Sequence, residues 1–265
     1  MNAMMYVLIF IFGSIIGSFL NVVIDRINTG RGFGGRSHCD VTGKKLKWYE
    51  LVPILSFLAQ GGKSRYSKSP ISIQYPLVEF GTGVLFVLIF AKLLPLSFTH
   101  PESFIFFLFF YFLIASILVS IFAYDIKHKI IPNYFVWEFN ILAFLSIFLS
   151  TTLPLQFVIP SVSLFLAGPL VALPIFFMWF ISKGRWIGFG DVKYCLGMGW
   201  LLGISGGFSA LLLSFWMGAL FGVLLLIKGG LKNHQIPFAP FLVLGTLIAF
   251  LYNIDMGVIS SLFVF

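Results

Sequence analysis

Charged side chains are scarce in this sequence, and their scarcity excludes a water-soluble globular protein. Asp, Glu, Lys and Arg make up 10% of the residues, whereas 59% are apolar. A soluble domain carries about 25% charged residues. A chain with so little charge cannot cover its own surface in water, so the composition predicts a polytopic membrane protein.

Cysteine is also scarce, which excludes a disulfide framework. The chain holds two cysteines, Cys39 and Cys195, too few to staple a fold through several bridges. Cys195 lies within an apolar run, where we expect it to act as a small buried hydrophobic side chain.

The first apolar run, residues 4–24, lacks the features of a cleaved signal peptide. No Lys or Arg precedes it, no small-residue cleavage site follows it, and Arg26 comes directly after it. The run is long enough to cross a bilayer at about 1.5 Å per residue. We therefore expect a first transmembrane helix with its N-terminus outside and its basic end in the cytoplasm. Gly13, Gly17 and Ser18 give this helix a small-residue stripe that suits close packing.

One long polar segment, residues 25–76, separates the first apolar run from the others. It begins with a glycine-rich loop and contains an apolar-rich patch at 48–58, which lies on the membrane surface or belongs to a small folded lobe. The sequence thus predicts an all-α protein with a first transmembrane helix (1–24), a basic cytoplasmic lobe (25–76) and a transmembrane catalytic domain (77–265). The eight predicted spans are 4–24, 77–98, 103–124, 134–153, 157–181, 191–204, 208–227 and 237–252. The glycine-rich sixth span could instead be a half-helix or a re-entrant segment.

The basic residues support this topology. With the N-terminus outside, the four cytoplasmic segments hold nine, two, three and two Lys or Arg residues, so that only Lys92 of the 17 lies outside. This is the distribution that the positive-inside rule requires. Because topology accounts for the net charge of +8, we expect no nucleic-acid partner. The same topology places Asp125 and Asp191 on the cytoplasmic side.

These two aspartates stand at the edges of apolar runs, where they could meet as an acid pair. Two carboxyl groups held close together share a proton. The ionised group can then take a proton from water while the protonated group polarises a peptide carbonyl, without any cofactor. A single Asp at a helix end is more often a cap or an interfacial anchor, so the residue pattern by itself leaves capping and catalysis open.

The residues beside each aspartate favour close approach of the chain. Gly188 and Gly190 precede Asp191, where they would let the backbone approach closely or turn sharply before the helix. Pro132 follows Asp125 and suits the first turn of the next helix. Lys193 flanks Asp191 and could stabilise a carboxylate, although topology alone accounts for it.

Several segments in order carry a resemblance to a known family. They are residues 17–26, 48–56, 71–79, 125–133, the Gly-Phe-Gly-Asp-Val-Lys segment at 188–193, and 236–241. On these motifs the chain resembles the type IV prepilin peptidase family, the leader peptidase/N-methyltransferases, which share the GxGD motif with presenilins. A GxGD motif alone is unspecific, but this ordered set covers nearly the whole chain.

The resemblance implies a function and a site. It implies that Asp125 and Asp191 are catalytic, supported by Gly188, Gly190, Lys193 and Pro132. It implies a protease of the bacterial inner membrane that cuts pilin-like precursors on the cytoplasmic side, after a Gly that ends a short basic leader. Proteolysis in the family needs no cofactor, and many members then methylate the new N-terminus with S-adenosylmethionine.

The polar segment departs from the family pattern. Many bacterial members carry two CxxC pairs there, a spacing suited to structural zinc. Here the corresponding residues are Cys39-Asp40-Val41-Thr42 and Ser64-Arg65-Tyr66-Ser67, so only Cys39 remains. We therefore expect no zinc and a lobe that is held by other packing. The sequence leaves methylation and the oligomeric state open.

Two other classes of protein share parts of the pattern. Intramembrane acids mark ion pathways in transporters and channels, and glycine-interrupted helices suit such sites. Against this class, both aspartates lie at the ends of predicted helices, and the sequence shows no internal repeat. A catalytically inactive assembly factor for a pilus or secretion machine would also fit, and only activity would separate it from a protease.

Overall fold

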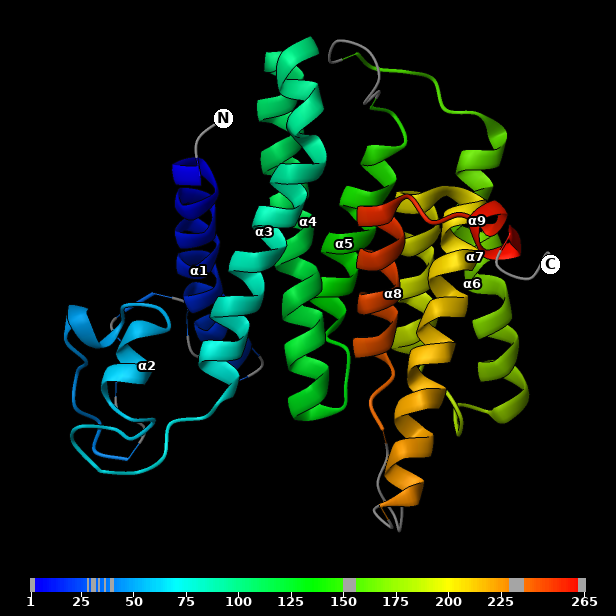
Figure 1. Ribbon diagram of the computed structural model, residues 1–265. Coiled ribbons are helices and arrows are strands. Elements are labelled where there is room, and N and C mark those ends of the chain that lie inside the picture. Colours follow the sequence, from blue (N-terminus) through cyan, green and yellow to red (C-terminus); the bar gives the residue numbers. More distant parts are fainter. Residues whose placement is uncertain are drawn as a thin grey trace. The chain divides into compact units, whose positions relative to one another are not determined.

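The structure is a computed structural model that describes residues 3–27, 29, 32, 34–35, 37–38, 41–149, 156–228 and 236–261. Within these ranges the chain is helical apart from turns, loops and three isolated β-bridges. The all-α prediction is confirmed (Figure 1). The helices are α1 (Ala3–Arg26), the 3₁₀ helix η1 (Trp48–Glu50), α2 (Leu55–Ala59), α3 (Gln74–Thr99), α4 (Pro101–His128), α5 (Asn133–Ser146), α6 (Val162–Ser182), α7 (Phe189–Ile227), α8 (Ala239–Tyr252) and α9 (Met256–Ser261).

Five of these helices are long and apolar enough to cross a membrane, by length and composition: α1, α3, α4, α6 and α7. The apolar helix α8 is shorter, with 14 residues. The chain is therefore a multi-pass membrane protein, and the count of eight spans stays a prediction. α5 ends at Ser146, and the last four residues of the span predicted at 134–153 lie outside the described residues.

A glycine breaks α7, the longest helix. A straight helix of its 39 residues would measure about 60 Å, roughly twice the ~30 Å hydrocarbon core of a bilayer. Gly203 has φ 73° and ψ 179°, so two helical segments meet there. Only glycine adopts this backbone conformation readily. The sequence predicted a division between residues 204 and 208, and the structure places it at Gly203.

The chain forms two compact units. The first comprises Met1–Leu94 and Leu108–Ala123, and the second comprises Pro95–Phe107 and Tyr124–Phe265. α4 contributes residues to both units, and Asp125 and Asp191 both belong to the second. The three segments predicted at 1–24, 25–76 and 77–265 remain a prediction.

In the first unit, α1 and α3 pack through small residues (Figure 1). A Cβ added at Gly13 would lie 2.8 Å from the Cα of Gly83, and one added at Gly17 would lie 2.8 Å from the Cα of Glu79. No side chain fits in so narrow a space, so the two backbones meet directly. The predicted small-residue packing surface at Gly13 and Gly17 is confirmed.

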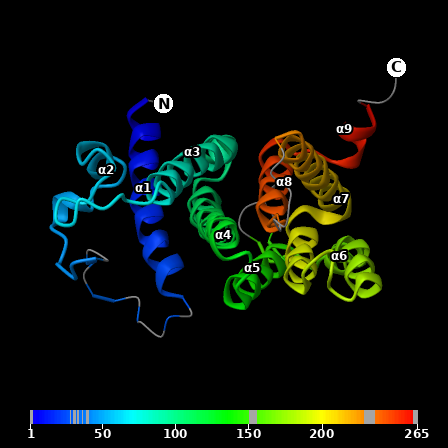
Figure 2. The same ribbon diagram turned by 90° about the horizontal axis from the view of Figure 1, so that it is seen from below.

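In the second unit, α7 is the central helix and contacts α5, α6, α8 and α9 (Figures 1 and 2). Small residues again permit close contact: a Cβ at Gly207 would lie 2.6 Å from Val171 of α6, and Gly199 lies against the backbone of Ala167. Cys195 of α7 is fully buried, as the sequence predicted. Because α7 begins two residues before Asp191, its packing fixes where that carboxyl group lies.

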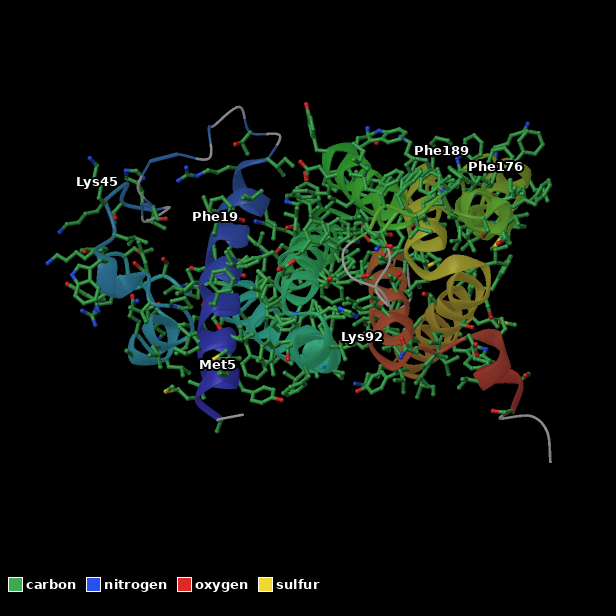
Figure 3. All side chains as sticks on the ribbon, turned by 90° about the horizontal axis from the view of Figure 1, so that it is seen from above. Met5, Phe19, Lys45, Lys92, Phe176 and Phe189 are labelled. Atoms are coloured by element: carbon green, nitrogen blue, oxygen red, sulfur yellow. The ribbon has the colours of Figure 1, made fainter. Side chains whose placement is uncertain are left out.

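A hydrogen bond joins two parts of the polar segment that contains α2. The carboxylate of Glu50, which is 7% exposed, accepts hydrogen bonds from the backbone N–H of Lys47 at 2.8 Å and from the hydroxyl of Tyr66 at 3.0 Å. The Lys44 ammonium lies 4.6 Å from the ring centre of Tyr66. Burial and the hydrogen bond to Glu50 raise the pKa of Tyr66. Figure 3 labels Lys45, one of the basic residues of this segment.

Two serines, Ser64 and Ser67, stand at the positions of the family's second cysteine pair. The hydroxyl of Ser67 lies 2.6 Å from that of Ser69, and the hydroxyl of Ser64 accepts a hydrogen bond from the backbone of Tyr66 at 3.4 Å. Hydroxyls engaged within their own turn are poor replacements for thiolate ligands. In the part of the chain that the structure describes, no group of three or more His, Cys, Asp or Glu could hold a metal. Cys39 lies outside the described residues, so the absence of zinc stays a prediction.

Candidate active site

Asp125 lies in the last turn of α4 and is 4% exposed. The helix ends three residues later, at His128. The next residue, Lys129, adopts a left-handed conformation, and its N–H donates to the carbonyl of Asp125 at 2.7 Å. Pro132 precedes the first residue of α5, with φ −65°. It therefore stands one position before the first turn in which the sequence placed it. This arrangement turns the chain within a few residues of Asp125.

Asp191 lies in the first turn of α7 and is 7% exposed. Its carboxylate accepts a hydrogen bond from the backbone N–H of Gly188 at 3.2 Å. Asp191 thus has a capping role, but it acts from the third position of α7, because the N-cap residue is Gly188. Capping engages one oxygen of the carboxyl group and leaves the other available for chemistry.

The two glycines of the motif differ in their structural roles. Gly188 has φ −75° and ψ 152°, an extended conformation that other residues adopt as well. Gly190 is needed for close approach, because a Cβ added there would lie 3.1 Å from the Cβ of Ile131. The expectation of close backbone approach therefore applies to Gly190, where the segment after α4 meets the start of α7.

The structure brings the two aspartates together. The carboxyl groups of Asp125 and Asp191 lie close enough to interact electrostatically. Asp125 also accepts a hydrogen bond from the backbone of Ala239, the first residue of α8. Three segments that are far apart in the sequence therefore meet at one buried site within the second unit. Two buried acids whose charges interact are a candidate pair for acid–base chemistry.

Lys193 faces a neutral partner. Its ammonium donates a hydrogen bond to the side-chain carbonyl of Asn133 at 2.9 Å and lies 5.2 Å from the ring centre of Phe189. Among the described residues, neither aspartate is a partner of this ammonium. The suggestion that Lys193 stabilises a carboxylate directly is therefore not what the structure shows.

Sequence reasoning missed a set of buried polar side chains on α5, α7 and α8. Asn140 of α5 is 2% exposed and donates to the carbonyl of Lys193 at 3.0 Å. The hydroxyls of Tyr194 and Thr246 lie 2.9 Å apart, and the ring of Phe139 stacks on Tyr194 at 5.1 Å. An Asn, Tyr or Thr within an apolar run signals that a polar partner exists. The run itself does not say which residue that partner is.

Aromatic side chains lie on α6 and at the start of α7. The rings of Trp179 and Phe189 are 4.8 Å apart, and Phe176 lies 5.9 Å from Trp179. Phe176 and Phe189 lie on the same side of the second unit (Figure 3). Phe189, the residue between Gly188 and Gly190, is 43% exposed, so part of its apolar ring lies at the surface.

These features define a class: a multi-pass helical membrane protein with a buried pair of carboxyl groups at two helix ends. Residues 11–93 match the bacterial peptidase A24 N-terminal domain, and residues 112–223 match the type IV leader peptidase family. The chain belongs to the type IV leader peptidase family and is a peptidase, which confirms the resemblance seen in the sequence. Both aspartates lie within the second match.

Relatives along nearly the full length agree with this family. A protein of Bacillus subtilis named prepilin leader peptidase/N-methyltransferase is 32% identical, over 93% of this chain and 94% of the relative. A protein of Xanthomonas campestris with the same name is 30% identical, over 92% of this chain and 90% of the relative. One of Vibrio cholerae is 30% identical over 76% and 79%, respectively. No solved structure matches the chain significantly.

Proposed function

We propose that this protein is a membrane aspartyl endopeptidase that removes the leader peptide from type IV prepilin-like precursors, with Asp125 and Asp191 as the catalytic pair. One observation carries the proposal: two buried carboxyl groups, 66 positions apart in the sequence, lie close enough to interact. They lie within the region that matches the type IV leader peptidase family. The names of the relatives supply the substrate class.

The chemistry follows from a shared proton. The ionised carboxylate removes a proton from water as the water oxygen bonds to the scissile carbonyl carbon, and the protonated carboxyl gives its proton to the carbonyl oxygen. The C–N bond then breaks. The first carboxyl returns a proton to the leaving nitrogen, and a hydroxyl proton of the intermediate restores the second. Water is the only reagent consumed.

Backbone N–H groups hold both carboxyl groups in place. Ala239 donates to Asp125 and Gly188 donates to Asp191. Each aspartate thus has a backbone N–H group that orients it, and neither of these donors carries a charge that would favour the doubly ionised pair. A preorganised pair of this kind needs no reorganisation when the substrate arrives.

The substrate class fits the position of the aspartates. We propose that the protein lies in the inner membrane of a bacterium with its N-terminus outside, so that both aspartates face the cytoplasmic edge. A prepilin-like precursor is a hydrophobic helix with a short basic leader, and its scissile bond would lie at that depth. The distribution of Lys and Arg supports this orientation.

A second activity, N-methylation of the new N-terminus with S-adenosylmethionine, is favoured by the printed names of the relatives, which include N-methyltransferase. The transporter or channel alternative loses support from the family membership. The alternative of an inactive assembly factor loses support for the same reason, and the following experiment tests the activity directly.

The test is cleavage of a co-expressed prepilin-like precursor by the wild type and by Asp125→Asn and Asp191→Asn, with mass spectrometry of the product's N-terminus. We expect each variant to lose about 100-fold or more of the activity, because each removes one partner of the proton exchange. Asp255→Asn is the matched control: Asp255 caps α9 through the N–H of Val258 at 2.9 Å, and Asn can form the same bond.

The outcomes separate the candidate functions. Full activity in either catalytic-pair variant would contradict the aspartyl mechanism. An inactive wild type, tested against several precursors, would favour the assembly factor. A product heavier by one methyl group would establish methylation in this chain.

A further inference from the structure

The segment after Asp125 contacts the first turn of α7 at two points that flank Asp191. Ile131 packs against Gly190, one residue before Asp191, where an added Cβ would lie 3.1 Å from the Ile131 Cβ. Asn133 accepts the hydrogen bond of the Lys193 ammonium at 2.9 Å, two residues after Asp191. The two motifs are therefore joined on both sides of the second aspartate.

The path from Asp125 to these contacts is short and constrained. The N–H of Lys129 bonds to the carbonyl of Asp125 at 2.7 Å, and Lys129 adopts the left-handed conformation that ends α4. Pro132 has a fixed φ and leads directly into α5. A displacement of Ile131 or Asn133 would therefore be transmitted to Asp125 through a stiff turn.

α5 binds Lys193 a second time, through its main chain. Asn140 lies two turns after Asn133 on the same face of α5 and donates to the carbonyl of Lys193 at 3.0 Å. Asn140 can lie this close to α7 because residue 197 is glycine: a Cβ there would lie 2.6 Å from the ring of Phe139 and collide with Asn140. One helix face thus holds both the side chain and the carbonyl of Lys193.

The hydrogen bond to Asn133 also determines which group the Lys193 ammonium does not reach. An ammonium bonded to Asp125 or Asp191 would stabilise the charged form of that carboxyl and oppose proton sharing. Asn133 and the ring of Phe189 occupy the Lys193 ammonium instead. The hydrogen bond between Lys193 and Asn133 can therefore position the start of α7 without stabilising the charged form of either aspartate.

We propose that Asn133 is a positioning residue, which through its hydrogen bond to Lys193 holds Asp191 in register with Asp125. The proposal rests on the proposed function, since it assumes that the two aspartates are the catalytic pair. It assigns a physical role to Lys193 and to Asn133 at the end of the first motif.

The kinetic experiment compares variants that break the bond with variants that retain it. Asn133→Ala removes the acceptor and Asn133→Asp keeps one. Lys193→Met removes the donor, whereas Lys193→Gln keeps a shorter one. We expect the breaking variants to lower kcat about 10- to 100-fold with little change in KM, because the aspartates are misplaced while substrate binding is unaffected. The retaining variants should recover most of the activity, and Lys183→Met, at the exposed end of α6, should match the wild type.

The double variant Asn133→Ala/Lys193→Met adds a coupling measurement. If the two residues act through one bond, the double variant should be no worse than the worse single variant. Independent losses that multiply would overturn the proposal.

A structural measurement separates this proposal from the proposed function. In a background with Cys39→Ser and Cys195→Ala, the pair Asp125→Cys and Asp191→Cys is oxidised, and the rate of disulfide formation is followed by mass spectrometry. We expect fast formation, slowed at least several-fold by Asn133→Ala and restored by Asn133→Asp. This reports the register of the two positions whether or not the protein cleaves a precursor.

The combined outcomes are decisive. Slower cross-linking supports the positioning role even if the wild type proves inactive, in which case only the proposed function fails. The positioning role is overturned, whatever the activity, if the protein with Asp125→Cys and Asp191→Cys forms no disulfide. It is also overturned if Asn133→Ala leaves the rate of disulfide formation unchanged.

Discussion

Gly190, directly before Asp191, lies in close contact with Ile131. Nothing larger than hydrogen fits between its Cα and Ile131 without movement, since an added Cβ would lie 3.1 Å from the Ile131 Cβ. A shift of a few tenths of an ångström is small for a packed core, yet here it acts directly before Asp191. Reactions that depend on two aligned groups are sensitive to displacements of this order.

We therefore expect Gly190→Ala to lower kcat by about 10-fold or more, with little effect on the yield of folded protein. Gly222→Ala in the same helix is the matched control, because no atom lies within 4 Å of a Cβ built there. Cleavage rates of the two variants, measured at equal protein level, test the prediction. Equal activity of Gly190→Ala and the wild type would show that the contact with Ile131 gives way without moving Asp191.

The partners of Lys193 in the structure differ from the partner that its place in the sequence suggests. Its place beside Asp191 in the sequence suggests electrostatic support of a carboxylate. In the structure its ammonium bonds to Asn133, and its carbonyl accepts from Asn140. The same residue therefore acts as a link between helices, a role that its position in the sequence does not reveal.

At the scale of elements, α7 both carries Asp191 and packs against its neighbouring helices, and it does so in two segments that differ in direction. Its first turn carries Asp191, and its later turns pack against α6 and α8. The break at Gly203 lets the two segments take different directions. Its φ of 73° and ψ of 179° lie in a region that side chains with a Cβ avoid.

Gly203→Ala should therefore destabilise the protein by about 1–3 kcal/mol, the cost of holding a residue with a Cβ in this conformation. Space is not the limitation, since the nearest atom would lie 3.9 Å from the added Cβ. Thermal unfolding in detergent, with Gly222→Ala for comparison, measures the difference. Equal stability of Gly203→Ala and the wild type would mean that α7 can change its conformation at residue 203 without a cost in free energy.

At the scale of the whole molecule, the polar segment keeps its own internal bonds. The hydrogen bond of Tyr66 to Glu50 joins two parts of this segment, and the backbone N–H of Lys47 bonds to the same carboxylate. The hydroxyls of Ser64 and Ser67 bond within their own turn. Hydrogen bonds of this kind are weaker individually than metal ligation, but they need no metal supply and no thiolates.

Chelation should accordingly leave this protein folded and active. We expect EDTA treatment to change neither precursor cleavage nor the tryptic pattern of the purified protein, and metal analysis to find no stoichiometric zinc. Tyr66→Phe removes the hydroxyl that bonds to Glu50 and should speed tryptic cleavage within residues 44–68 but not elsewhere. Loss of activity on chelation, with recovery on zinc addition, would show that a metal is bound after all.

The sequence by itself determined that the long apolar segments are helical, and it made the two aspartates visible as candidates. Apolar runs of about 20 residues must be helical in lipid, because only a helix satisfies its own backbone there. Charges must lie at the ends of such runs, so Asp125 and Asp191 were visible as candidates. The small-residue surface of α1 was equally local, since Gly13 and Gly17 are four positions apart on one helix face.

Only the tertiary structure decided what those residues touch. The bonds of Lys193 to Asn133 and of Asn140 to Lys193 join residues 60 and 53 positions apart. The contact of Ala239 with Asp125 spans a still longer separation. Each depends on the rotation of one helix against another, which is set by the packing of many side chains. A local pattern carries no information about that rotation, because the same apolar run can face a neighbour in any register.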